Sequence, residues 1–75
     1  MRDKLYQNIE KLTKRENNVL EYLVLGFDNE EIARELGITI HTVKDHVSHI
    51  IKKFHAKNRV HVAFIAGAGD QVEIR

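Results

Sequence analysis

Hydrophobic residues recur along this chain at the three- and four-residue spacing of amphipathic helices. The spacing is regular in four successive segments, and residues that start or end helices bound each one. The expected helices follow Thr13, Asp28, Thr39 and Asn58 and end near Gly26, Leu36, Phe54 and Ala66. Thr13 with Glu16, and Asp28 with Glu31, also have the spacing of a capping box. The pattern predicts an all-α domain built as a four-helix bundle.

The segment Glu30–Phe54 has the pattern of a helix-turn-helix. Its first helix carries Ala33, whose small side chain lets the second helix cross close to it. Gly37 follows the helix end, where a left-handed backbone favours glycine. Val43 then points from the second helix back onto the first. The two interpretations are a helix pair that projects into a DNA groove and a hairpin that packs only with protein.

The third predicted helix, at about residues 40–54, has an apolar and a polar face. The positions assigned to the core are Val43, Val47, Ile50 and Phe54. The polar positions are His41, Lys44, Asp45, Ser48 and Lys52. Lysine donates to guanine O6 and N7, a carboxylate accepts from cytosine N4, and serine does either. The residues that we expect to read base edges are Lys44, Asp45, Ser48 and His41.

Asp45 has a second interpretation, because phosphates repel a carboxylate that meets no donor. It either accepts a hydrogen bond from a base or orients Lys44 or a histidine. Lys52 reaches either a base or a phosphate.

Contacts to the DNA backbone are predicted at both ends of this helix. Hydroxyls and free N–H groups at a helix start suit phosphate, as do basic side chains near the far end. The predicted phosphate contacts are Thr39, Thr42, Lys52, Lys53, Lys57 and Arg59. Thr39 is also expected to cap the helix, and Arg59 has an ion pair with Glu16 as its alternative.

The fourth predicted helix is apolar on more than one side. Val60, Ala63 and Phe64 are assigned to the core, which leaves Val62 and Ile65 on a second face. An isolated domain seldom needs two apolar faces on its last helix. We therefore predict a homodimer through Val62 and Ile65, with scattered exposed apolar residues as the alternative.

Charge is uneven along the chain, although the net charge is only +1. Residues 38–66 carry five basic and one acidic side chain and all five histidines, whereas residues 1–37 carry six basic and eight acidic side chains. Positive charge around one helix is typical of a phosphate-binding surface. It favours double-stranded DNA as the partner over a module that docks on another regulator without reading DNA. RNA polymerase and other regulators are additional candidate partners.

Other classes of function lack support in the sequence. A chain of 75 residues has a thin core, and no phosphate loop, nucleophile elbow or paired-acid motif occurs, so neither an enzyme nor a cofactor is expected. Cysteine is absent, and His46 and His49 at i, i+3 have no third ligand nearby, so no metal is expected. No apolar run approaches the ~20 residues that span a bilayer. We expect a cytoplasmic protein without membrane contact.

A dense set of residues also matches one known family. The matched residues are Leu12-Thr-Lys-Arg-Glu16, Val19-Leu20, Gly26, Glu31-Ile-Ala33, Leu36-Gly-Ile38, Thr42-Val-Lys44, His46, Ile50, Lys53 and Asn58-Arg59. In order and spacing they resemble the LuxR-type (GerE/NarL-like) DNA-binding domain. The resemblance implies a bacterial transcription regulator with its third helix in the major groove and its fourth at the dimer contact. It also implies that His46 lies at the boundary with phosphate.

Two positions depart from that family. Ile40 stands where a basic or polar residue is usual, and either contacts a thymine methyl or is simply exposed. Phe54-His55 replaces the usual leucine-glycine. We divide the chain into an extension (1–11, helical from Met1 to Leu12 or frayed), the DNA-binding domain (12–67) and a loose C-terminal tail (68–75). The chain resembles either a stand-alone regulator or a fragment of a longer one.

Overall fold

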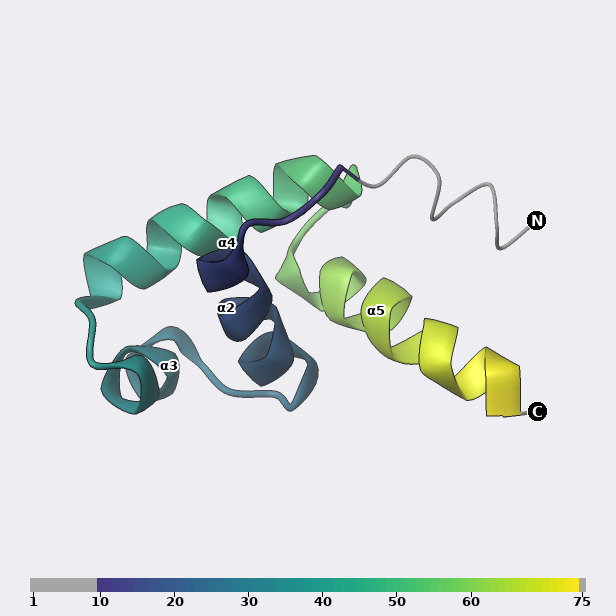
Figure 1. The fold of residues 1–75 in the computed structure, drawn as a ribbon, viewed down its shortest axis with the longest axis horizontal. Helices are drawn as coiled ribbons and strands as arrows, with labels where there is room; N and C mark the ends of the chain where they lie inside the picture. The colour runs from purple at the N-terminus through teal and green to yellow at the C-terminus, as the bar shows by residue number, and fades with distance from the viewer. Residues whose placement is uncertain (1–9, 75) are drawn as a thin grey trace.

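The protein is described by a computed structural model over residues 10–74, with side chains described as far as residue 67 (Figure 1). The helices in this part of the chain are α2 (Lys14–Val24), α3 (Asn29–Leu36), α4 (Ile40–Phe54) and α5 (Arg59–Ile74). They confirm the predicted all-α helix-turn-helix bundle. Helix α4 contacts each of the other three helices, and α2 also contacts α5. Helix α4 is therefore the central element of the packing.

The core forms along one face of α4. The four positions assigned to it from the helical period are all buried: Val43, Val47, Ile50 and Phe54. The residues that surround them are Val19 and Leu23 of α2, Ile32 and Ala33 of α3, and Val62 of α5. Figure 1 shows α4 crossing above α2 and α3, with α5 leading away from its C-terminal end. Burial of this face leaves the opposite face of α4 in solvent.

Side chains cap the start of every helix between residues 10 and 67, as their sequences predict. Each cap side chain accepts the N–H of the third helical residue, and the pairs are Thr13 with Glu16, Asp28 with Glu31, Thr39 with Thr42, and Asn58 with His61. In the first two pairs the glutamate also accepts the N–H of the cap residue, which completes the capping box. One such cap contributes about 1 kcal/mol.

The turn between α3 and α4 depends on Gly37. Its φ of +67° lies in the left-handed region, and the Ile38 N–H donates to the Ala33 carbonyl at 3.1 Å. A Cβ built on Gly37 would meet no atom within 4 Å. The backbone conformation, and not lack of space, is therefore what favours glycine at this turn.

The end of α4 makes the same left-handed turn without a glycine. His55 has φ +55° and ψ +38°, and its N–H donates to the Ile51 and Lys52 carbonyls. This is the position at which the family usually has glycine. A residue with a Cβ costs about 1–2 kcal/mol in this conformation.

The predicted end of the last helix, near Ala66, is wrong. Helix α5 continues through Gly67 and Gly69 to Ile74, so residues 68–74 are helical and do not form the loose tail that we expected. Glycine lowers helix stability by about 1 kcal/mol relative to alanine but still adopts the right-handed conformation. The predicted N-terminal helix over Met1–Leu12 falls largely outside the described residues, and residues 10–12 are not helical.

The predicted faces of α5 are also wrong. Val62 is fully buried at 0% exposure and Ile65 is half-buried against the core, whereas Val60 and Phe64 are 72% and 69% exposed. In a helix that is apolar on more than one side, the period alone does not tell which side faces inward. Packing decides instead, and Arg59 fastens the start of α5 to the turn between α2 and α3. Its guanidinium donates to the Phe27 carbonyl at 2.9 Å and to the Asn29 side chain.

We expect His55→Gly to stabilise the protein, because it relieves the left-handed strain at the end of α4. The substitution removes about 1–2 kcal/mol of strain. The greater conformational freedom of glycine in the unfolded chain offsets part of this gain in stability. The net gain should be about 0.5–1 kcal/mol, which raises Tm by several degrees in a domain of this size. Thermal melts followed by circular dichroism measure this.

Gly37→Ala is the matched control, because it introduces the same strain at the left-handed residue that precedes α4. It should lower Tm by a similar amount. A His55→Gly protein that melts at or below the parent temperature contradicts the interpretation of His55.

Candidate nucleic-acid interface

The solvent-exposed face of α4 lies opposite its buried stripe. All the polar positions that the helical period placed on it are exposed, namely His41, Lys44, Asp45, Ser48 and Lys52. They come from one straight helix with a length of 15 residues. Their roles in base reading remain predictions, but the shared face is what a groove-reading helix requires.

Two of these residues contact each other. The His41 Nε2 lies 3.6 Å from the Asp45 Oδ2, with side chains that are 85% and 60% exposed. The contact is an ion pair only when the His41 ring is protonated. This contact supports the interpretation in which Asp45 orients a histidine. Lys44 and Ser48 make no side-chain polar contact within the described part of the chain, so both are available to a ligand.

The start of α4 presents hydroxyl and backbone donors. The Thr39 Oγ1 accepts the Thr42 N–H at 3.1 Å, and the two hydroxyl oxygens lie 2.9 Å apart. Thr39 is therefore a cap, as predicted. The N–H groups of Ile40 and His41 precede the first intrahelical bond, so they are free to meet an anion. The Ile40 side chain is exposed beside them.

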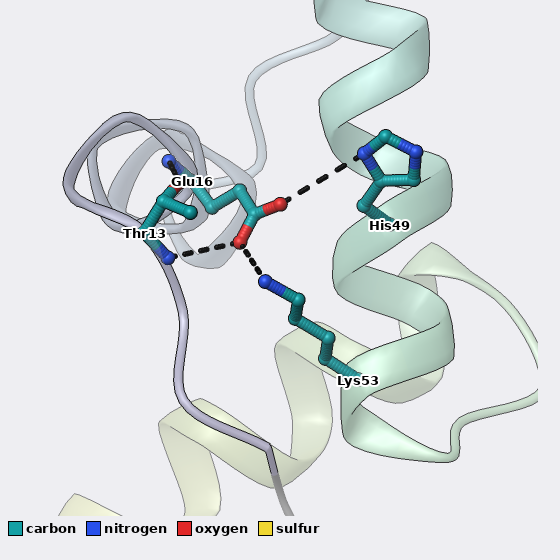
Figure 2. A network of polar contacts seen from close by, with 4 residues as sticks. All are labelled: Thr13, Glu16, His49 and Lys53. Atoms are coloured by element: carbon teal, nitrogen blue, oxygen red, sulfur yellow. Dashed lines mark hydrogen bonds and ion pairs between the residues drawn. The ribbon is translucent and has the colours of Figure 1, made fainter.

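A buried carboxylate holds the last turn of α4 against the start of α2 (Figure 2). Glu16 is only 4% exposed, and its Oε1 accepts the Lys53 Nζ at 2.8 Å and the Thr13 N–H at 2.9 Å. The His49 Nδ1 lies 3.9 Å from the other oxygen, Oε2. The alternative of an Arg59–Glu16 ion pair is wrong, because Lys53 takes that place and Arg59 binds Phe27 and Asn29.

The pKa of Glu16 reflects opposing effects. Burial raises it, but the hydrogen bonds from Lys53 and Thr13 and the positive charge of Lys53 outweigh burial and hold the pKa below its ordinary value of 4.5. Glu16 is therefore an anion throughout the neutral range. Its ion pair is well shielded from water, which makes it stronger than a surface pair.

The predicted phosphate contacts fall into two groups. Thr39, Lys52 and Lys57 keep side chains at the surface, and Thr42 and His46 are half-buried. Lys53 and Arg59 are instead engaged inside the fold, Lys53 with Glu16 and Arg59 with the turn before α3. The structure thus gives both cations a packing role, which the sequence had raised only for Arg59 and with a different partner. The Lys53–Glu16 contact joins positions 37 residues apart, and no local spacing signals it.

The described residues contain neither a cluster of metal-ligand side chains nor a membrane-spanning helix. Among them, no three histidine, cysteine, aspartate or glutamate side chains converge as a metal site would require. No helix in the same region has the length and apolarity to cross a bilayer.

Comparison with known proteins identifies the family. The model of the family described as bacterial regulatory proteins, luxR family, matches residues 10–66. The chain belongs to this family. It is a family of regulators and not of enzymes. The match spans all the helices described above up to the middle of α5.

Similar proteins include three bacterial regulatory proteins. The nitrate/nitrite response regulator protein NarL of Escherichia coli K12 is 44% identical over 57 residues, which is 76% of this chain and 26% of NarL. The transcriptional regulatory protein DesR of Bacillus subtilis is 43% identical over 56 residues, covering 75% of this chain and 28% of DesR. The response regulator protein VraR of Staphylococcus saprophyticus is 39% identical over 69 residues, covering 88% and 33%. The chain therefore spans about a quarter to a third of these relatives.

We expect Glu16→Gln to destabilise the protein at pH 7 by about 1–3 kcal/mol, because it leaves the Lys53 ammonium without its carboxylate. The lowered pKa of folded Glu16 means that its contribution is present above its ordinary value of 4.5 and is lost as pH falls through the lower folded value. The difference between parent and variant should therefore shrink as the solution is acidified from pH 7 to about 3. Urea unfolding at a series of pH values measures it.

A Glu31→Gln variant serves as the control, because Glu31 completes the other capping box without an ion pair to a neighbouring helix. Its effect should be smaller than that of Glu16→Gln at neutral pH. A Glu16→Gln effect that is constant across the pH series would contradict the assigned charge of Glu16.

Proposed function

We propose that this chain is the DNA-binding domain of a LuxR-type transcription regulator, and that α4 enters the major groove of double-stranded DNA. The observation that carries the proposal is the division of α4 into a buried apolar face and an exposed polar face. Membership of the luxR family and the excess of basic residues over 38–66 support it. Such a role places the chain in the cytoplasm, where bacterial DNA lies.

In this mechanism phosphate contacts provide most of the affinity and set the register. The start of α4 supplies donors through Thr39, Thr42 and the first N–H groups of the helix, and Lys52 and Lys57 supply charge beyond its middle. Lys44 and Ser48 read base edges, and Asp45 does so together with His41, its contact on the same face. Whether a promoter is activated or repressed depends on where the bound site lies.

We further propose that the domain works as a homodimer through α5. The exposed apolar residues Val60 and Phe64 are one turn apart on this helix, so they form the contact face in place of Val62 and Ile65. Two copies related by a two-fold axis would place their α4 helices in successive turns of the groove. Exposed side chains of this size are otherwise unfavourable in a small soluble domain.

We expect Lys44→Ala to weaken binding selectively. After selection of a preferred duplex from a random pool, fluorescence anisotropy should show a loss of about 1–3 kcal/mol on that duplex and little loss on a shuffled one. Lys52→Ala distinguishes the two roles proposed for Lys52. A phosphate contact would weaken binding to both duplexes equally and reduce the salt slope by about 1.

Arg34→Ala is the control for removal of a positive charge, because Arg34 is exposed on α3 and is not one of the proposed contact residues. It should leave the preference between the duplexes unchanged. A folded parent chain that binds neither duplex at low salt would overturn the proposal. The rival function, a module that docks on another protein, would then become the working hypothesis.

We expect Phe64→Asp to abolish self-association without loss of fold, because the side chain is 69% exposed in the single chain. Sedimentation equilibrium should show half the parent mass, and circular dichroism should show an unchanged helix content. Leu25→Asp is a matched control, since Leu25 is also 69% exposed but lies at the end of α2. Equal dissociation by both variants, or a parent that is already monomeric at high concentration, would contradict the α5 interface.

A further inference from the structure

His49 has no role in the base-reading and phosphate-contact sets described above. It shares one stripe of α4 with Thr42, His46 and Lys53, at i−7, i−3 and i+4. These three neighbours are half-buried, whereas the His49 side chain is 60% exposed. The stripe therefore forms the edge between the exposed face of α4 and the side that packs on α2. In a groove-reading helix, such an edge lies toward the phosphates and away from the bases.

The ring of His49 is oriented by a buried charge. Figure 2 shows its Nδ1 turned toward Glu16, and this nitrogen lies 3.9 Å from the Glu16 Oε2. The other carboxylate oxygen is already taken by Lys53 and Thr13. The lowered pKa of Glu16 keeps the carboxyl ionised, so it presents only an acceptor to the imidazole.

An acceptor at Nδ1 decides which tautomer of the imidazole is favoured. At 3.9 Å the contact is electrostatic and not a hydrogen bond, and it favours the neutral tautomer whose proton lies on Nδ1, toward the carboxylate. In that tautomer Nε2 carries a lone pair that repels a phosphate oxygen, and the ring must gain a second proton before Nε2 can donate. The Nε2 lies on the side of the ring away from Glu16 (Figure 2).

We infer that His49 is a DNA phosphate contact whose binding to phosphate requires uptake of a proton, and that Glu16 is the positioning residue that imposes this requirement. The inference rests on the proposed DNA-binding function and deepens it. It predicts that DNA affinity rises on acidification through the range in which histidine changes charge, at about pH 5 to 8. Each further phosphate that the protein neutralises also steepens the salt dependence of binding by about 0.9.

Several titratable and charged groups surround His49. Among the described residues, Glu16 of α2 is the titratable group that faces it from a neighbouring helix. On α4 itself, the titratable and charged side chains one turn away are Asp45, His46, Lys52 and Lys53. Lys53 binds Glu16 directly, and Asp45 contacts His41. Because His41 and His46 also change charge with pH, the test compares variants and does not rely on the parent alone.

The experiment is fluorescence anisotropy of the full chain on a labelled pool of mixed-sequence duplexes at pH 6 and pH 8, each over a series of salt concentrations. Uptake of one proton on binding raises the DNA affinity of the parent by up to about tenfold for each pH unit of acidification, and His49→Gln should remove this gain. At pH 6 the variant should also reduce the slope of log affinity against log salt concentration by about 0.9. His49→Arg should restore the salt slope and make it equal at both pH values. His55→Asn is the matched control, because it removes an exposed histidine at the end of α4 and suits the left-handed backbone.

Glu16→Gln tests the positioning role, with folding checked by circular dichroism. Without the ionised carboxylate, the neutral ring is free to carry its proton on Nε2. Binding at pH 8 should therefore persist while the dependence on pH declines, which mere loss of packing would not produce. If Glu16→Gln does not fold, the His49→Gln and His49→Arg pair decides the inference alone.

Two different failures are distinguishable. If the parent binds DNA and His49→Gln shows the same dependence on pH and salt as the parent, the inference is overturned and the proposed function stays intact. A folded parent that binds duplex at neither pH overturns the proposed function and this inference with it.

Discussion

The burial of one face of α4 is the constraint on which the rest of this structure depends. This face contributes four residues to the core, Val43, Val47, Ile50 and Phe54. Each of the other described helices packs against α4. A domain of 75 residues has a small core, so losing this stripe would remove most of it. Because the apolar residues occupy one side of the helix, the opposite side remains free for a ligand. Stability and the proposed DNA reading thus use opposite faces of one element.

The pair formed by Glu16 and Lys53 adds a second constraint, which concerns orientation. Packing of aliphatic side chains tolerates small rotations of a helix, whereas a hydrogen-bonded ion pair of 2.8 Å has a defined geometry. Glu16 belongs to the capping box of α2, so the start of α2 and the last turn of α4 are tied together. The same carboxylate faces His49 at the edge of the exposed face. The Glu16 carboxylate therefore stabilises the fold and also faces a residue of the proposed DNA interface.

Left-handed residues at both ends of α4 show how local backbone chemistry sets where the helix begins and ends. Gly37 adopts this conformation without strain, and the turn leads directly into the Thr39 cap. His55 adopts it with a Cβ, and this strain is tolerated because the chain must reverse toward α5. Arg59 then fastens α5 to the turn between α2 and α3. The length of α4 is thus determined at its termini, independently of the side chains on its exposed face.

The sequence by itself determined the features that depend on neighbours along the chain. The caps at Thr13, Asp28, Thr39 and Asn58, the glycine turn and the two faces of α4 all follow from spacings of a few residues. Contacts between distant segments had no such signal. Only the tertiary structure decided that Val62 points inward and Phe64 outward, and that Lys53 pairs with Glu16 while Arg59 does not. The physical reason is that a helix with more than one apolar side has no single preferred rotation, and a cation no preferred carboxylate, until the other helices are in place.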